Sequence, residues 1–162
     1  MMTPPAPQHE WLKQLIGEWT MEGECSMGPD QPPSKSSGKE TVRAFGHLWI
    51  VCDGAGQMPG TDTIMHSRMT LGFDASKNAY VGTWIGSCIP TLFVYEGTID
   101  LAKPAALPLN TIGPSWADPT KLVRYQDVIE IQSNDRRLLW SQVELEPGKW
   151  TRFMTATYTR VK

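Results

Sequence analysis

Polar side chains within otherwise apolar, strand-like stretches are the residues of this sequence that could do chemistry. They are His66, Arg68, Glu96, Arg124, Tyr125 and Arg152. Burying such a group costs free energy unless it finds a partner or a ligand. An interior Arg–Glu or Arg–Tyr pair could bind a ligand carboxylate, and the same groups could transfer a proton. Alternatively, each forms a solvated ion pair on an outer surface.

The sequence is also rich in large, adaptable apolar side chains, with 7 Trp and 8 Met in 162 residues. Methionine and tryptophan can line an apolar pocket, but they can equally fill a core. Combining these side chains with the polar candidates, we predict one set of ligand-binding residues: His66, Trp84, Glu96, Arg124, Tyr125, Trp140 and Met154.

No metal or cofactor site is indicated. The three histidines, His9, His47 and His66, are far apart, and the spacings His-x-His, Cys-x-x-Cys and His-Glu-x-x-His are absent. The glycines of residues 54–60 have the wrong spacing for a dinucleotide-binding loop. We therefore expect a chain without a cofactor.

Composition and the N-terminal sequence exclude some classes of partner and indicate a cellular compartment. A formal net charge of -2 and the lack of a basic cluster argue against nucleic acid and anionic membranes as partners. The N-terminus lacks the basic start and apolar run of a signal peptide. Three widely spaced cysteines indicate thiols rather than a disulfide framework, so we expect a cytoplasmic protein.

The elements that would position these residues are nearly all strands. Only residues 8–16 show helical spacing, before Gly17. Alternation then begins with Trp19, Met21, Gly23, Cys25 and Met27 on one face. Further strands are predicted at 39–45, 47–52, 64–73, 79–85, 92–99, 107–112, 122–131, 137–145 and 150–161.

The connections between these strands indicate how they are arranged. Most are short and hairpin-like, while longer, mobile loops are expected at 28–37, 54–61 and 103–119. We predict an all-β, antiparallel up-and-down barrel of about ten strands, with the short N-terminal helix closing one end. Residues 1–162 form one domain, of which 1–7 are expected to be flexible.

The order of several short motifs carries a family resemblance. Gly17-Glu18-Trp19, after a helix and at the start of the first strand, resembles the Gly-x-Trp signature of the calycins, which include lipocalins and fatty-acid-binding proteins. Together with later motifs, from Phe45-Gly46-His47-Leu48-Trp49 to Tyr158-Thr159-Arg160, the chain is similar to bacterial calycin-like domains of unknown function.

This resemblance implies a barrel with an interior cavity and, by analogy, small apolar ligands. It also implies a structural role for Gly17 and Trp19, with Trp19 covered by Arg160 or Arg152 in a cation–π contact. Haem-binding calycins take an axial histidine from the C-terminal part of the barrel. No histidine follows His66 here, so haem is not expected.

Three functions remain open. The leading hypothesis is a barrel that binds a small apolar or carboxylate-bearing molecule, with residues 54–61 near its opening. The second is an enzyme, an isomerase, decarboxylase or hydrolase, that uses Glu96 with Arg124, Tyr125 or His66. The third is a barrel filled by its own side chains that forms a homodimer.

Overall fold

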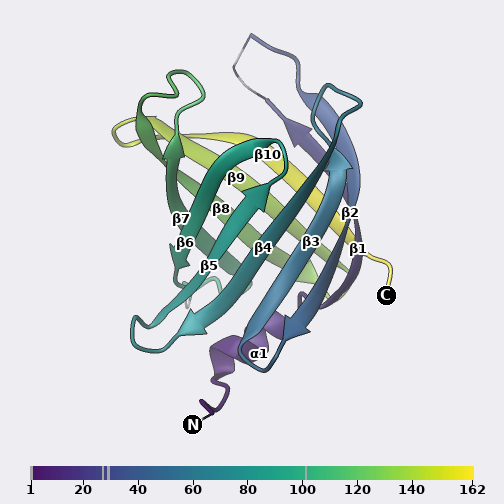
Figure 1. Cartoon of the computed structure of the whole chain (residues 1–162), viewed down its shortest axis with the longest axis vertical. Coiled ribbons are helices and arrows are strands. Elements are labelled where there is room, and N and C mark those ends of the chain that lie inside the picture. The colour runs from purple at the N-terminus through teal and green to yellow at the C-terminus, as the bar shows by residue number, and fades with distance from the viewer. Residues whose placement is uncertain (1, 27, 29, 101) are drawn as a thin grey trace.

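The chain folds into a closed β-barrel. The computed structural model describes residues 2–26, 28, 30–100 and 102–162, and within them ten antiparallel strands follow one another around the barrel (Figure 1). Pairing of β1 (Gly17–Cys25) with β10 (Lys149–Arg160) closes the ring. The other strands are β2 (Ser34–Phe45), β3 (Trp49–Gln57), β4 (Ile64–Asp74), β5 (Ala79–Gly86), β6 (Ile89–Gly97), β7 (Ala106–Pro114), β8 (Leu122–Ser133) and β9 (Arg136–Glu146). The predicted up-and-down barrel is confirmed.

Alternation along the strands separates the interior from the outer surface. In β1, Trp19 is buried, and Glu18 and Thr20 on either side of it are exposed. Met27, predicted to continue this face, lies outside the described residues. Because closure pairs the first strand with the last, the barrel has no terminal sheet edge.

The helix is shorter than predicted. It spans Pro7–Lys13 as α1, at the lower end of the barrel in Figure 1, and not residues 8–16. After Lys13 the backbone tightens through i to i+3 bonds, from the Leu15 amide to the Leu12 carbonyl and from the Ile16 amide to the Lys13 carbonyl. Leu12 and Leu15 are both almost fully buried, so the segment closes this end of the barrel as predicted.

All three predicted loops are shorter than expected. Residues 34–37 of the predicted loop 28–37 belong to β2. Residues 54–57 belong to β3, and the connection to β4 covers only 58–63. Gly54 and Gly56 lie within the strand at positions with little room for a side chain: a Cβ on Gly54 would sit 2.6 Å from the Ser67 hydroxyl. A Cβ on Gly56 would sit 3.0 Å from the Ser37 carbonyl oxygen. Likewise, β7 occupies the middle of the stretch 103–119.

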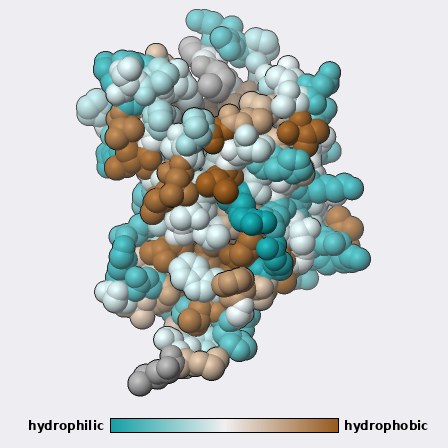
Figure 2. Space-filling view, in the orientation of Figure 1, coloured by the Kyte–Doolittle hydropathy of each residue, from teal (hydrophilic) through white to brown (hydrophobic). Residues whose placement is uncertain are grey.

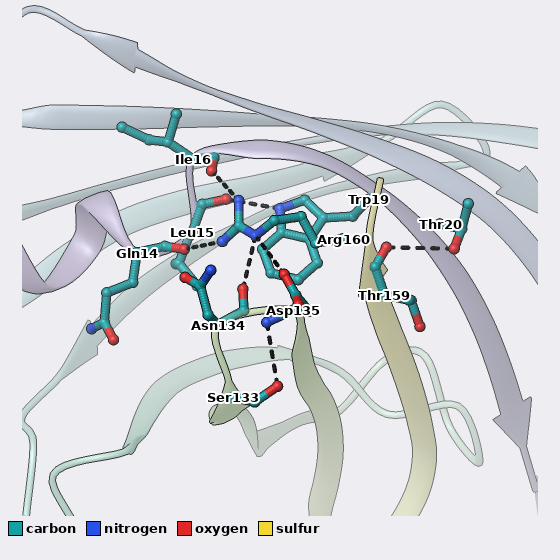
Figure 3. A network of polar contacts seen from close by, with 10 residues as sticks. All are labelled: Gln14, Leu15, Ile16, Trp19, Thr20, Ser133, Asn134, Asp135, Thr159 and Arg160. Atoms are coloured by element: carbon teal, nitrogen blue, oxygen red, sulfur yellow. Dashed lines mark hydrogen bonds and ion pairs between the residues drawn. The ribbon is translucent and has the colours of Figure 1, made fainter. Parts of the chain in front are cut away.

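The Gly-x-Trp segment anchors the closed end (Figure 3). Gly17 has a φ of 143°, and a Cβ there would lie 2.4 Å from Nη1 of Arg160, so a side chain is excluded. The indole of Trp19 donates to the Leu15 carbonyl at 2.9 Å, and the Arg160 guanidinium lies 4.2 Å from the centre of its ring. Arg152 stacks instead on Trp140, on the outer surface.

One seam of the barrel is weakly paired. Between β6 and β7 the ladder consists of the single pair Glu96–Asn110, whereas β7 and β8 pair along the whole of β7. Outside this seam lies a groove of about 430 Å³, lined by Leu92, Val94, Asn110, Thr111, Ile112, Arg124, Tyr125 and Trp150. The adjoining strands β5 and β6 carry further exposed apolar side chains, which Figure 2 shows as brown patches on this face.

Candidate functional site

The barrel encloses a cavity of about 640 Å³. All ten strands contribute residues to its lining, as do Pro59 in the 58–63 connection and Trp116 and Pro119 in the 115–121 connection. These two connections lie at the end opposite α1, where the cavity opens. The volume falls within the range of pockets that hold drug-sized molecules.

Small residues leave this space empty. Gly23, Gly54 and Gly56 line the cavity on the β1–β3 side, where no side chain projects from them. Towards α1 the interior is filled instead by leucines and other large side chains, including Leu71, Leu107 and Leu109. The cavity therefore occupies only the open half of the barrel.

Most of the cavity wall is apolar. Met21, Met65, Met69 and Trp84 line it on β1, β4 and β5. Near the opening, Phe93 packs edge-to-face against Trp84, with 5.9 Å between ring centres, and Phe93 and Phe153 each pack on Tyr125 at 6.1 Å. These rings and thioethers suit an apolar molecule of irregular shape.

A polar group lies on the opposite wall. Asp127 of β8 accepts a hydrogen bond from the Ser141 hydroxyl at 2.5 Å and a second from the Tyr95 hydroxyl. All three residues line the cavity; Tyr95 and Ser141 are buried, and Asp127 is partly buried. Burial raises the pKa of Asp127 above its ordinary value, although both hydroxyls favour the charged form. Burial, reinforced by the charge of Asp127, raises the pKa of Tyr95 well above 10.0.

Thr111 of β7 lies next to this group. It is 7% exposed, lines the cavity, and its hydroxyl has no hydrogen-bond partner among the described residues. Thr111 pairs with Tyr125, two residues before Asp127 on the same face of β8, so Thr111 and Asp127 are diagonal neighbours. Four consecutive strands, β6 to β9, thus place Tyr95, Thr111, Asp127 and Ser141 on one part of the wall.

A second polar group lies between the cavity and the closed end. Glu40 lines the cavity and pairs with the buried Arg137 guanidinium. That guanidinium stacks on Tyr158, 4.0 Å from the ring centre, and on Trp19 at 4.6 Å. Trp19 therefore contacts two arginines, Arg160 and Arg137. Arg137 Nε is buried without a hydrogen-bond partner among the described residues, but Arg137 does not line the cavity, where Glu40 stands in front of it.

Three of the predicted ligand-binding residues line the cavity: Trp84, Tyr125 and Met154. Tyr125 also donates from its hydroxyl to the Pro114 carbonyl at 2.6 Å. Burial raises the pKa of Tyr125 above 10.0.

The predicted interior position of His66, Glu96, Arg124 and Trp140 is corrected, because strand alternation points all four outward. His66 is exposed and follows the inward-facing Met65. Glu96 pairs with Lys77 at 3.2 Å, and Arg124 with Glu144 at 2.5 Å. Trp140 donates to Glu130 at 3.3 Å and is covered by Arg152. The acid–base set proposed from Glu96, Arg124, Tyr125 and His66 is therefore not assembled.

Sequence reasoning missed the residues that make up the two interior polar groups: Glu40, Tyr95, Asp127, Arg137 and Ser141. The alternation of side chains along a strand could have predicted one of them, Asp127. Tyr125 and Asp127 share a face of β8, whereas Arg124 lies on the other face, so selecting Tyr125 should have selected Asp127 as well.

Among the described residues, no group of three or more His, Cys, Asp or Glu side chains could hold a metal ion. Across the same residues, no helix is long and apolar enough to cross a membrane.

Comparisons with known proteins identify a matching family and solved structures with a similar fold. The family described as "Protein of unknown function (DUF1579)" matches residues 4–160. No curated protein matches the chain. Among solved structures, the S-type phycobiliprotein lyase CPES from Guillardia theta is similar, with a TM-score of 0.64 and 12% identity over 96% of this chain and 93% of that one. Rv2717c from M. tuberculosis has a TM-score of 0.63 and 13% identity over 98% of this chain and all of that one. At these identities the likeness shows a shared fold.

Proposed function

This chain belongs to the DUF1579 family of proteins of unknown function. From the geometry of the barrel, we propose that the protein binds a small, mainly apolar molecule in its interior. The observation that carries the proposal is the cavity of about 640 Å³, lined by methionine and aromatic side chains with few polar groups. Interiors are normally close-packed, and an apolar molecule that displaces water from an apolar-lined cavity of this size gains free energy.

The arrangement of the cavity supports this function. Its wall is apolar near the opening and on β1, β4 and β5, so an apolar body would be desolvated there. The polar groups Asp127 and Glu40 lie deeper and could orient one end of the molecule. A barrel filled by its own side chains would lack such a void, so the cavity favours binding over a role in self-association alone.

The first test is native mass spectrometry of protein purified without added ligand, compared under gentle and denaturing conditions. A small molecule that leaves only on denaturation supports the proposal and reveals the ligand's chemistry. The same spectrum reports the oligomeric state and so tests the predicted homodimer.

A second test fills the cavity and compares two neighbouring serines. Ser36 faces the cavity, whereas Ser37, the next residue of β2, is exposed. We expect Ser36→Phe to weaken the binding of the neutral fluorescent probe N-phenyl-1-naphthylamine at least about tenfold, because the added ring occupies probe space. Ser37→Phe should bind the probe as the wild type does. Equal binding by both variants, or no binding by the wild type, would overturn the proposal.

We also propose that the protein works in a reducing, cytoplasmic compartment. Cys52 and Cys88 form no disulfide, and Cys88 is exposed. Burial raises the pKa of the Cys52 thiol well above 9.0, which keeps that thiol protonated and inert. Fractionation of the native host, followed by detection of the chain, tests this location.

A further inference from the structure

Resting on the proposed function, we infer that the cavity selects a ligand whose apolar body carries a protonated amine, and that Asp127 receives this amine. This ligand replaces the carboxylate-bearing one that the sequence suggested.

The charged side chains inside the barrel do not balance one another. Among the described residues, the charged side chains that line the cavity are Glu24, Lys39, Glu40 and Asp127. Glu24 and Lys39 carry opposite charges and are exposed, so the acidic side chains that are shielded from solvent are Glu40 and Asp127. Glu40 is paired with Arg137, which is only 4% exposed and is covered by Tyr158. Asp127 accepts hydrogen bonds from two hydroxyl groups and forms no ion pair with any residue that the structure describes. When Asp127 is ionised, it is therefore a negative charge without an ion-pair partner among those residues, and it attracts a cation and repels a carboxylate.

Asp127 has acceptor sites that no hydrogen bond from a described residue uses. An ionised carboxylate has about four lone-pair sites. Ser141 uses one on Oδ1 and Tyr95 uses one on Oδ2. Both donors are buried and held by their own strands, so they fix the carboxylate with its remaining acceptor sites towards the cavity. An ammonium group has three donors and no acceptor, which matches these sites.

A second polar atom in the cavity wall, the Thr111 hydroxyl, lacks a hydrogen-bond partner among the described residues. This hydroxyl is buried and lines the same cavity. Buried polar atoms without partners are uncommon and indicate a missing ligand or water. As a diagonal neighbour of Asp127, Thr111 can accept the second of an amine's hydrogen bonds.

The apolar body of the ligand would lie across the cavity from Asp127. Met21, Met65 and Trp84 line the β1, β4 and β5 side of the cavity, across from β8. A molecule whose amine meets Asp127 would therefore pack its hydrocarbon part against these side chains. This arrangement separates the charged end of the ligand from its apolar end within one cavity.

The experiment measures displacement of N-phenyl-1-naphthylamine by three matched ten-carbon molecules at pH 7: decylammonium, decanol and decanoate. We expect wild-type affinity to fall in that order, with decylammonium binding at least about tenfold more tightly than decanoate. Decanoate binding as tightly as decylammonium would overturn the inference. Probe binding without amine preference leaves the proposed function standing, whereas no probe binding removes both.

Variants then locate the selectivity. Asp127→Asn keeps the shape and removes the charge, and should weaken decylammonium about tenfold while leaving decanol unchanged. Glu96→Gln makes the same chemical change on the outer surface and should alter none of the three affinities. If Asp127→Asn weakens all three ligands equally, Asp127 has only a structural role and the inference fails. Should Asp127→Asn not fold, the wild-type ligand series decides alone.

Discussion

Arg160 joins three parts of the closed end, and its removal allows a quantitative test of the fold. Its guanidinium donates to the carbonyls of Ile16 at 2.6 Å, Gln14 at 2.8 Å and Asn134 at 2.8 Å, as Figure 3 shows. It also stacks on Trp19. One side chain thus links the end of the helical segment, the β8–β9 hairpin and the Gly-x-Trp strand.

The change Arg160→Met keeps most of the aliphatic stem and removes every donor. The bond to Ile16 is partly buried and charged, so its loss costs about 1.5 kcal/mol. The other two bonds are exposed and water can replace them, at about 0.5 kcal/mol each. Because the Arg160 side chain is 17% exposed, the stacking on Trp19 contributes about 0.5 to 1 kcal/mol.

We therefore expect Arg160→Met to lower the free energy of unfolding by about 3 kcal/mol, or the Tm by about 6 to 12 °C for a chain of this size. Urea denaturation followed by tryptophan fluorescence measures it. Arg136→Met is the control, because Arg136 is exposed and its side chain makes no ion pair or hydrogen bond to any described residue. Its effect should stay within about 0.5 kcal/mol. A loss below about 1 kcal/mol, or one equal to the control, would refute the idea that Arg160 anchors this end.

Further predictions concern the cavity wall and the seam. The folded state raises the pKa of Asp127, so its charge opposes folding increasingly as pH rises above 3.8. Asp127→Asn should therefore gain stability relative to the wild type between pH 4 and pH 7 in urea denaturation, and a constant difference would contradict this. Thr111→Val removes a buried hydroxyl without a partner and should stabilise the ligand-free protein by about 1 kcal/mol, whereas a loss of that size would show a hidden partner. Since Glu96–Asn110 is the only β6–β7 pair among the described residues, β6 amides that point towards β7 should exchange with solvent faster than those of β9. Uniform protection around the barrel would show that the seam is closed in solution.

The sequence by itself determined the architecture. Period-two alternation, short hairpin connections and one helical segment before Gly17 were sufficient for an all-β meander closed into a barrel, because these are local patterns read within each element. Alternation also predicts that Trp19 and Met21 face the same side of their strand, as do Met65 and Met69. Element ends were less predictable, since Gln14 and Ile16 leave the helix to give their carbonyls to Arg160, near the other end of the chain.

Only the tertiary structure decided which face of each strand is the interior. In β8 both faces mix polar and apolar residues, so alternation separates Arg124 from Tyr125 without saying which points inward. A register irregularity between Arg152 and Met154 changes the phase within β10, which places Arg152 outside and Met154 in the cavity. The polar groups of the site join residues far apart in sequence, Glu40 with Arg137 and Tyr95 with Asp127. Their contacts depend on barrel closure and curvature, which bring distant strands across a common interior and which no local pattern encodes.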